Sequence, residues 1–187
     1  MDRRSRVFIL TAAIALSATT TLAVRADEFE QHGAHEHGKI TINAALDRQE
    51  LSIELDAPAD NVIGFEHTPH TDAEKAAVRD ADVLLRNGQG LFGFPPAAQC
   101  RFTGSQVTAP HWEVERSETR GESGHEHHAD YEARLTYQCK VPQELAWFEP
   151  WLLGKLHEVR EARVNLITAS GQRSQVVTHP RDRVALR

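Results

Sequence analysis

The sequence predicts an α+β fold, namely a small single domain with an antiparallel β-sheet, one or two helices and a mobile histidine-rich loop. Three observations lead to this prediction. Several segments alternate apolar and polar residues with the period of two that is typical of a β-strand. One segment opens with a helix capping box, and one long stretch contains almost no apolar residue.

The predicted strands follow one another along the chain. Residues 40–55 alternate on both sides of a polar turn at 47–50, which predicts a β-hairpin. The strictest alternation of the chain lies at 131–141. Further strands are expected at 99–103, 162–168 and 175–178.

Two helices are predicted. The first runs from about Asp72 to Asn87, because Thr71 and Glu74 form a capping box before it and Gly88 ends it. The second is a short helix within 147–156, where aromatic residues are concentrated and a proline permits a helix to begin. We interpret this second helix as packed against the core.

Residues 113–130 form the stretch that lacks apolar residues, with five glutamates, two glycines and three histidines. Such a composition cannot bury enough apolar surface to offset the entropy lost on ordering. We therefore predict a flexible, acidic and histidine-rich surface loop, and expect the same of residues 27–36.

The N-terminus has the pattern of an export signal. Three arginines within the first six residues precede an apolar run at 7–18, and Val24-Arg25-Ala26 is an acceptable cleavage site. We predict a signal peptide at 1–26 and a periplasmic domain at 27–187. Because the apolar run is too short to span a bilayer comfortably, we expect no integral membrane segment after cleavage.

The charge of the chain argues against several partners. The net charge is −6, and removal of residues 1–26 leaves 17 basic and 26 acidic residues, a net charge of −9. A protein of this charge has no electrostatic reason to bind nucleic acid or anionic lipid. Acidity attracts cations without selectivity, so selectivity requires specific ligands.

Only two cysteines are present, Cys100 and Cys139. In an oxidising compartment a lone pair predicts a disulfide. The alternative is a pair of metal thiolates, which their separation and the absence of a C-x-x-C motif make less favourable.

Histidine is the residue type that points to a function. Eight of the eleven histidines fall into three clusters: His32, His35 and His37; His67 and His70; and His125, His127 and His128. Neutral imidazole is a good ligand for zinc, copper and nickel. His35 and His37 are two residues apart at the entrance to a strand, so they share a face.

Glu66, beside the second histidine cluster, can supply an oxygen ligand or accept an imidazole N–H. The isolated His111, His157 and His179 are interpreted as solvated or hydrogen-bonded side chains.

Several motifs together resemble the ZrgA-like family of periplasmic zinc-binding proteins. These motifs are His35-Glu36-His37-Gly38, Val62-Ile63-Gly64-Phe65-Glu66-His67, Pro95-Pro96-Ala97-Ala98-Gln99-Cys100, the histidine-rich insertion at 124–130, and Tyr137-Gln138-Cys139. The resemblance implies a role in zinc acquisition beside an ABC-type metal importer. It also implies His35, His37 and His67 as ligands, and it implies no enzymatic activity.

The leading hypothesis is therefore a periplasmic protein that captures, buffers or delivers Zn²⁺. One alternative is an envelope structural or adaptor protein with incidental metal binding, and another is a copper- or nickel-binding protein. A zinc hydrolase is disfavoured, because the sequence contains neither H-E-x-x-H nor G-x-S-x-G.

Overall fold

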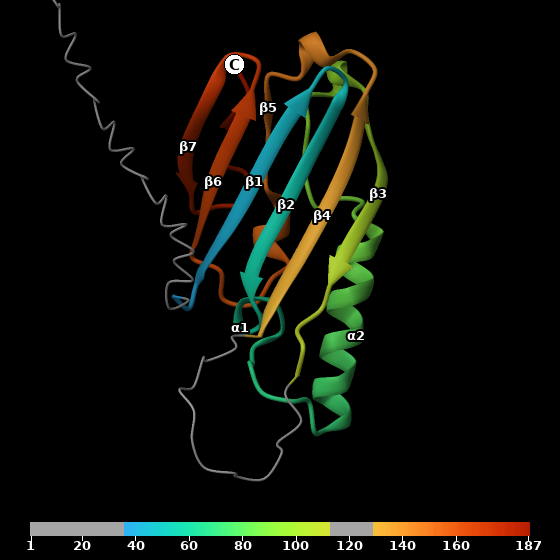
Figure 1. Ribbon diagram of the computed structural model, residues 1–187, viewed down its shortest axis with the longest axis vertical. Helices are drawn as coiled ribbons and strands as arrows, with labels where there is room; N and C mark the ends of the chain where they lie inside the picture. Colours follow the sequence, from blue (N-terminus) through green and yellow to red (C-terminus); the bar gives the residue numbers. More distant parts are fainter. Residues whose placement is uncertain (1–35, 113–128) are drawn as a thin grey trace, which may run out of the picture. The chain divides into compact units, whose positions relative to one another are not determined.

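A six-stranded β-sheet dominates the computed structural model, which describes residues 36–112 and 129–187 (Figure 1). The strands lie in the order β3-β4-β2-β1-β6-β7. Their bounds are β1 (Lys39–Asp47), β2 (Glu50–Pro58), β3 (Cys100–Thr108), β4 (Asp130–Cys139), β6 (Glu161–Thr168) and β7 (Gly171–Val177). The predicted α+β class and the predicted strands are confirmed, although β3 and β7 are longer than expected.

The sheet is mixed rather than purely antiparallel. β1 pairs antiparallel with β2 through the predicted hairpin and parallel with β6 on its other side. β6 enters the sheet from the same end as β1, where the N–H groups of Arg160 and Glu161 donate to the carbonyl of Gly38 at 2.8 and 3.0 Å. The parallel pair arises because the chain crosses the domain before it adds β6.

Alternation along the strands gives the sheet one buried and one polar face. Ile42, Ile53 and Leu135 point into the core and are no more than 1% exposed. The residues between them carry polar pairs across the strands, such as Arg134 Nε to Glu54 Oε1 at 2.8 Å. This pattern is typical of a sheet that is covered on one side only.

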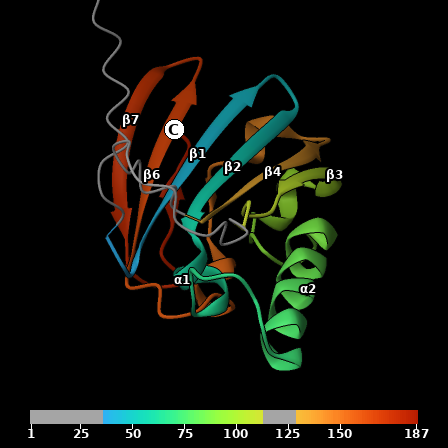
Figure 2. The ribbon, with the colours of Figure 1, turned by 60° about the horizontal axis from the view of Figure 1, so that its bottom comes forward.

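The long helix α2 (Asp72–Asn87) has the predicted bounds. Both hydrogen bonds of its capping box are present, and Gly88 ends it in the left-handed conformation at φ 62°. A shorter helix, α1 (Ala59–Ile63), follows β2 directly and was not predicted, because five residues show no helical period. Figure 2 shows α2 beside β3 and α1 at the end of β2.

The short helix predicted within 147–156 is confirmed only after Pro150, and only as a 3-10 helix. Trp147 and Phe148 instead form β5 (Trp147–Phe148), which pairs antiparallel with β8 (Val184–Ala185), and a short 3-10 helix follows at Trp151–Gly154. The extended pairing with the C-terminal segment overrides the local preference. Phe148 is fully buried, whereas Trp147 and Trp151 are only half-buried.

Cys100 and Cys139 form the predicted disulfide, which joins residues directly opposite each other in β3 and β4. The alternative of metal thiolates is thereby set aside.

The predicted signal peptide and residues 113–128 of the predicted loop lie outside the described residues. The chain resumes with Ala129, which is buried and accepts a hydrogen bond from the Ala59 N–H at 2.7 Å. Across the two described ranges, no helix has the length and apolar character needed to cross a bilayer.

Candidate metal centre

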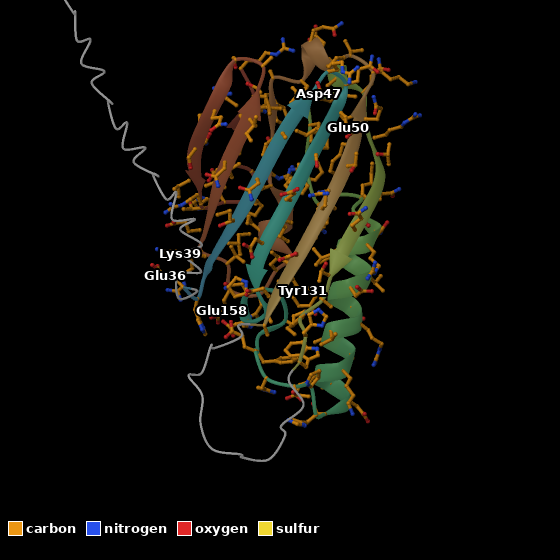
Figure 3. The ribbon with its side chains drawn as sticks, viewed as in Figure 1. Glu36, Lys39, Asp47, Glu50, Tyr131 and Glu158 are labelled. Carbon is orange, nitrogen blue, oxygen red and sulfur yellow. A yellow bond between two sulfur atoms is a disulfide. The ribbon has the colours of Figure 1, made fainter. Side chains whose placement is uncertain are left out.

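One end of the six-stranded sheet is formed by the starts of β1, β4 and β6 and by the last residues of β2, β3 and β7. The strand register shows this, because Lys39 pairs with Glu161, Pro58 with Asp130, Thr108 with Glu132 and Val177 with Ala162. Figure 3 shows Glu36, Lys39 and Glu158 at this end, and Asp47 and Glu50 at the other.

All six histidines within the described residues lie in segments attached to this end of the sheet, which we call the histidine end. They are His37 before β1, His67 and His70 after α1, His111 after β3, His157 before β6, and His179 after β7. The disulfide lies at the opposite end. Strand order and direction therefore bring together histidines that are spread over most of the chain.

A first group at this end consists of His67, His70 and Glu74. Nε2 of His67 lies 3.9 Å from Oε1 of Glu74, and the two imidazole rings are nearly parallel with centroids 6.1 Å apart. The other carboxylate oxygen of Glu74, Oε2, accepts the backbone N–H groups of His70 at 2.7 Å and Thr71 at 2.9 Å. The capping box thus holds the carboxylate and leaves Oε1 facing the histidine.

These hydrogen bonds set the charge of Glu74. The backbone N–H of Thr71, followed by that of His70, lowers the pKa of the Glu74 carboxyl below its usual range. The group is therefore a carboxylate at neutral pH. Nitrogen and oxygen ligands of a tetrahedral zinc ion lie about 3.3 Å apart, given bond lengths of about 2.0–2.2 Å, so a movement of roughly half an ångström brings His67 and Glu74 to that spacing.

Aromatic residues support the same group. The ring of Phe65 stacks on His67 with centroids 4.9 Å apart, and on Trp112 with centroids 6.0 Å apart. Trp112 follows β3, so this stack ties the segment after α1 to the end of a distant strand. It limits the positions that the His67 imidazole can occupy.

A second group consists of His37, Asp60 and His157. Nδ1 of His37 lies 3.1 Å from Oδ2 of Asp60, and Nδ1 of His157 lies 3.2 Å from the backbone carbonyl oxygen of the same residue. If each Nδ1 carries its proton toward Asp60, each Nε2 keeps a lone pair for a metal ion. Gly64 packs closely against the His157 ring, because a Cβ on this residue would lie 3.3 Å from ring atoms.

The predicted ligand residues have different outcomes. His37, His67 and His70 lie at the histidine end, but in two separate groups. Glu66 is half-buried, and its buried Oε1 atom has no hydrogen-bond partner among the described residues. The predicted ligands that lie outside the described residues are His32, His35, His125, His127 and His128.

Sequence reasoning did not connect Glu74, Asp60 or His157 with the candidate site, although His157 is hydrogen-bonded as expected. Glu74 was assigned to the capping box alone, and nothing local in the sequence links Asp60 or His157 to a histidine cluster. Within residues 36–112 and 129–187, no three histidine, cysteine or carboxylate side chains already stand in a metal-binding arrangement. Each group contains two imidazoles and one carboxylate residue.

Comparison with protein-family models places the chain in a family. No curated protein matches the chain in sequence. A family model described as ZrgA family zinc uptake protein matches residues 34–186, which includes every described element from β1 to β8. This family takes part in zinc uptake and is not a family of enzymes. The chain therefore belongs to the ZrgA family of zinc uptake proteins.

Proposed function

We propose that the chain works in the periplasm, where it binds Zn²⁺ at the histidine end of the sheet and captures, buffers or delivers the ion for uptake. The observation that supports this proposal is the gathering of all six described histidines at one end of the fold. The zinc ion here is cargo. A site for cargo needs donors that close around the ion and also release it.

The donor chemistry supports zinc. His67 and His70 offer imidazole nitrogens, and Glu74 offers a carboxylate oxygen held charged by backbone N–H groups. Zinc accepts nitrogen and oxygen ligands of this kind in four-coordinate sites. A four-coordinate zinc ion would take one further donor, either water or another histidine.

We extend the proposal to the second group and to the histidines outside the described residues. His37 and His157 are oriented by Asp60 in the way that carboxylates and carbonyls orient metal-binding histidines. Donation by His32 and His35, by Glu66, and by His125, His127 and His128 is also proposed. The support is that the described residues next to the undescribed segments lie at the histidine end, namely Glu36, Trp112 and Ala129.

We also propose that the ion passes to an ABC-type metal importer. The support for this step is family membership in zinc uptake, together with an acidic chain that contains neither H-E-x-x-H nor G-x-S-x-G. Transfer to an importer requires a protein that binds the zinc ion and then releases it.

Zinc titration of the mature protein, purified without a histidine tag or added metal, tests the proposal. We expect saturable binding of at least one ion with micromolar affinity or better in calorimetry at pH 7.5. His67→Gln should weaken this binding at least tenfold. The matched control is His179→Gln, because His179 is hydrogen-bonded to Thr178 within its own turn and belongs to neither group.

Two results would contradict the proposal: heat that never saturates, or equal losses of affinity in the His67→Gln and His179→Gln variants. Titration with Cu²⁺ and Ni²⁺ under the same conditions tests the selectivity. Tighter binding of copper is expected from its intrinsic affinity for nitrogen ligands. Zinc selectivity is therefore judged from the geometry around the bound ion, and from competition between the metals at their physiological availability.

A further inference from the structure

A second surface, separate from the histidine end, is built from arginine and tryptophan. The C-terminal segment runs beside β5, and its side chains alternate: Val184 and Leu186 are buried, whereas Arg181, Arg183 and Arg187 are exposed. The segment is held by β5–β8 pairing and by the Leu186 N–H, which donates to the Ala146 carbonyl at 2.8 Å. The arginines therefore share one outward side.

Two of these arginines stack on tryptophan rings. The guanidinium carbon of Arg183 lies 4.2 Å from the centroid of Trp147, and that of Arg181 lies 4.6 Å from the centroid of Trp151. Contacts of this kind stabilise a cation by about 0.5–1 kcal/mol at exposed sites. We call the group formed by Trp147, Glu149, Trp151, Arg181 and Arg183 the arginine–tryptophan ladder.

The Glu149 carboxylate contacts three other members of the ladder. It is only 7% exposed, and its carboxylate accepts Nε1–H of Trp151 at 2.8 Å and Nε–H of Arg183 at 3.2 Å. Nη1 of Arg181 lies 3.5 Å from the same carboxylate. The hydrogen bond from Trp151 and those from the arginines lower the pKa of the Glu149 carboxyl, so the carboxylate remains charged.

The ladder contains two positively charged guanidinium groups but only one carboxylate. One carboxylate serves two guanidinium groups, and the side chains of Arg181 and Arg183 remain 74% and 63% exposed. Within the described part of the chain, the terminal amino groups of Arg183 make no hydrogen bond. A guanidinium has five N–H donors in a planar fork, so the two arginines present unused donors to solvent.

The C-terminal residues are basic, although the chain as a whole is acidic. Residues 173–187 contain four arginines and one aspartate, although the whole chain carries −6. Tryptophan and arginine are the residue types most enriched at the energetic centres of protein interfaces. Arginine forks bind carboxylates in pairs of parallel hydrogen bonds.

From this geometry we propose that the arginine–tryptophan ladder is a docking surface for an acidic, carboxylate-rich segment of a partner protein. The partner's carboxylates take up the unused guanidinium donors, and the tryptophan rings keep both forks in place before binding. A membrane surface is disfavoured. The described part of the chain has three large apolar side chains that are strongly exposed, namely Val83, Ile167 and Val176, and none of them belongs to the ladder.

A defined peptide tests the proposal without knowledge of the natural partner. The probe is a capped ten-residue peptide of alternating glutamate and threonine, titrated into the full mature protein at low salt without zinc. We expect saturable binding that weakens at least tenfold in the Arg181→Gln/Arg183→Gln variant. The same peptide with glutamine in place of glutamate should not bind.

The matched control is Arg48→Gln/Arg79→Gln, which removes the same charge from exposed positions outside the ladder. It should change affinity less than twofold. Equal losses in both double variants would overturn the proposal in favour of diffuse electrostatic attraction. Binding to vesicles with 30% phosphatidylglycerol that depends on Arg181 and Arg183, without peptide binding, would overturn it in favour of a membrane surface.

The ladder also stabilises the C-terminal segment, and two measurements separate the roles. Unchanged peptide affinity with a lower Tm in the glutamine variant would overturn the proposal and leave the ladder a purely structural contact. If that variant fails to fold, Arg181→Lys/Arg183→Lys keeps both charges and removes the forks, and we expect at least threefold weaker binding. In a Trp112→Phe background, the remaining tryptophans are Trp147 and Trp151, and a peptide that saturates without changing their fluorescence would also overturn it.

Discussion

Nδ1 of His37 lies 3.1 Å from Oδ2 of Asp60, although 23 positions separate the two residues in the sequence. The contact joins the segment before β1 to the short helix after β2, and these two strands are hairpin partners. A carboxylate in this position accepts the Nδ1 proton, so Nε2 would keep its lone pair for a metal ion.

Asp60→Asn is therefore expected to weaken zinc binding about tenfold or more, as is usual when the partner of a ligating histidine is lost. Zinc titration against a competing chelator measures the change. Asp80→Asn on the exposed side of α2 is the matched control. Equal affinity in Asp60→Asn and the unmodified protein would show that His37 is not a ligand that depends on Asp60.

Glu74 is expected to serve both the helix cap and the metal. Glu74→Gln keeps an oxygen for the Thr71 and His70 N–H groups but removes the charge, so zinc affinity should fall while stability changes by less than about 1 kcal/mol. Thr71→Ala should do the opposite, with a loss of about 1 kcal/mol of stability and unchanged zinc affinity. Calorimetry and chemical denaturation of both variants separate the two roles, and parallel changes in both quantities would contradict the assignment.

Zinc affinity should fall as the pH decreases through about 6.5, because protons compete with zinc for imidazole nitrogens near the ordinary histidine pKa. Titration at pH 7.5 and 5.5 measures the difference. Binding that is equally tight at both values would mean that carboxylates rather than histidines hold the ion.

Gly88 and Gly90 allow backbone strain to be separated from side-chain crowding. Both have positive φ, at 62° and 67°, but a Cβ on Gly88 would collide with the ring of Phe102, whereas a Cβ on Gly90 meets nothing within 4 Å. Gly90→Ala should cost about 1–2 kcal/mol from the left-handed conformation. Gly88→Ala should cost a further 1–3 kcal/mol or so from overpacking, and similar unfolding free energies for the two variants would contradict this account.

Glu149 should make stability depend on pH in the acid range. Its folded pKa is lowered, first by the Trp151 N–H, so the stabilisation is complete above the unfolded value of about 4.3 and is lost as the pH falls through the folded value. The Tm of the natural protein should fall below about pH 4, and Glu149→Gln should reduce this slope. A slope that the substitution leaves unchanged would place the acid sensitivity elsewhere.

Removal of the disulfide should destabilise the fold without altering zinc binding. Cys100 and Cys139 close a loop of 39 residues at the end of the sheet opposite the histidines. The Cys100→Ser/Cys139→Ser variant should lose roughly 3–4 kcal/mol of unfolding free energy on the chain-entropy model. Denaturant titration measures this loss, and a changed zinc affinity at temperatures where the variant is folded would contradict the separation of the two ends.

The sequence by itself determined the elements whose signals are local. The capping box of Thr71 and Glu74 located the start of α2, and strict alternation located β4 to within two residues at either end. The helix permitted by Pro150 is present as a short 3-10 helix, but no local signal predicted the strand at Trp147 and Phe148. Their extended conformation comes from pairing with a segment that lies more than thirty residues later.

Only the tertiary structure decided which histidines come together. His37 and His157 are 120 positions apart in the sequence, and both reach Asp60 because β1 and β6 run parallel from the same end of the sheet. Likewise, the position of Glu74 beside His67 depends on how the segment after α1 turns into α2. Spacing along a chain reports short-range geometry, whereas strand order and direction are set by the packing of the whole core.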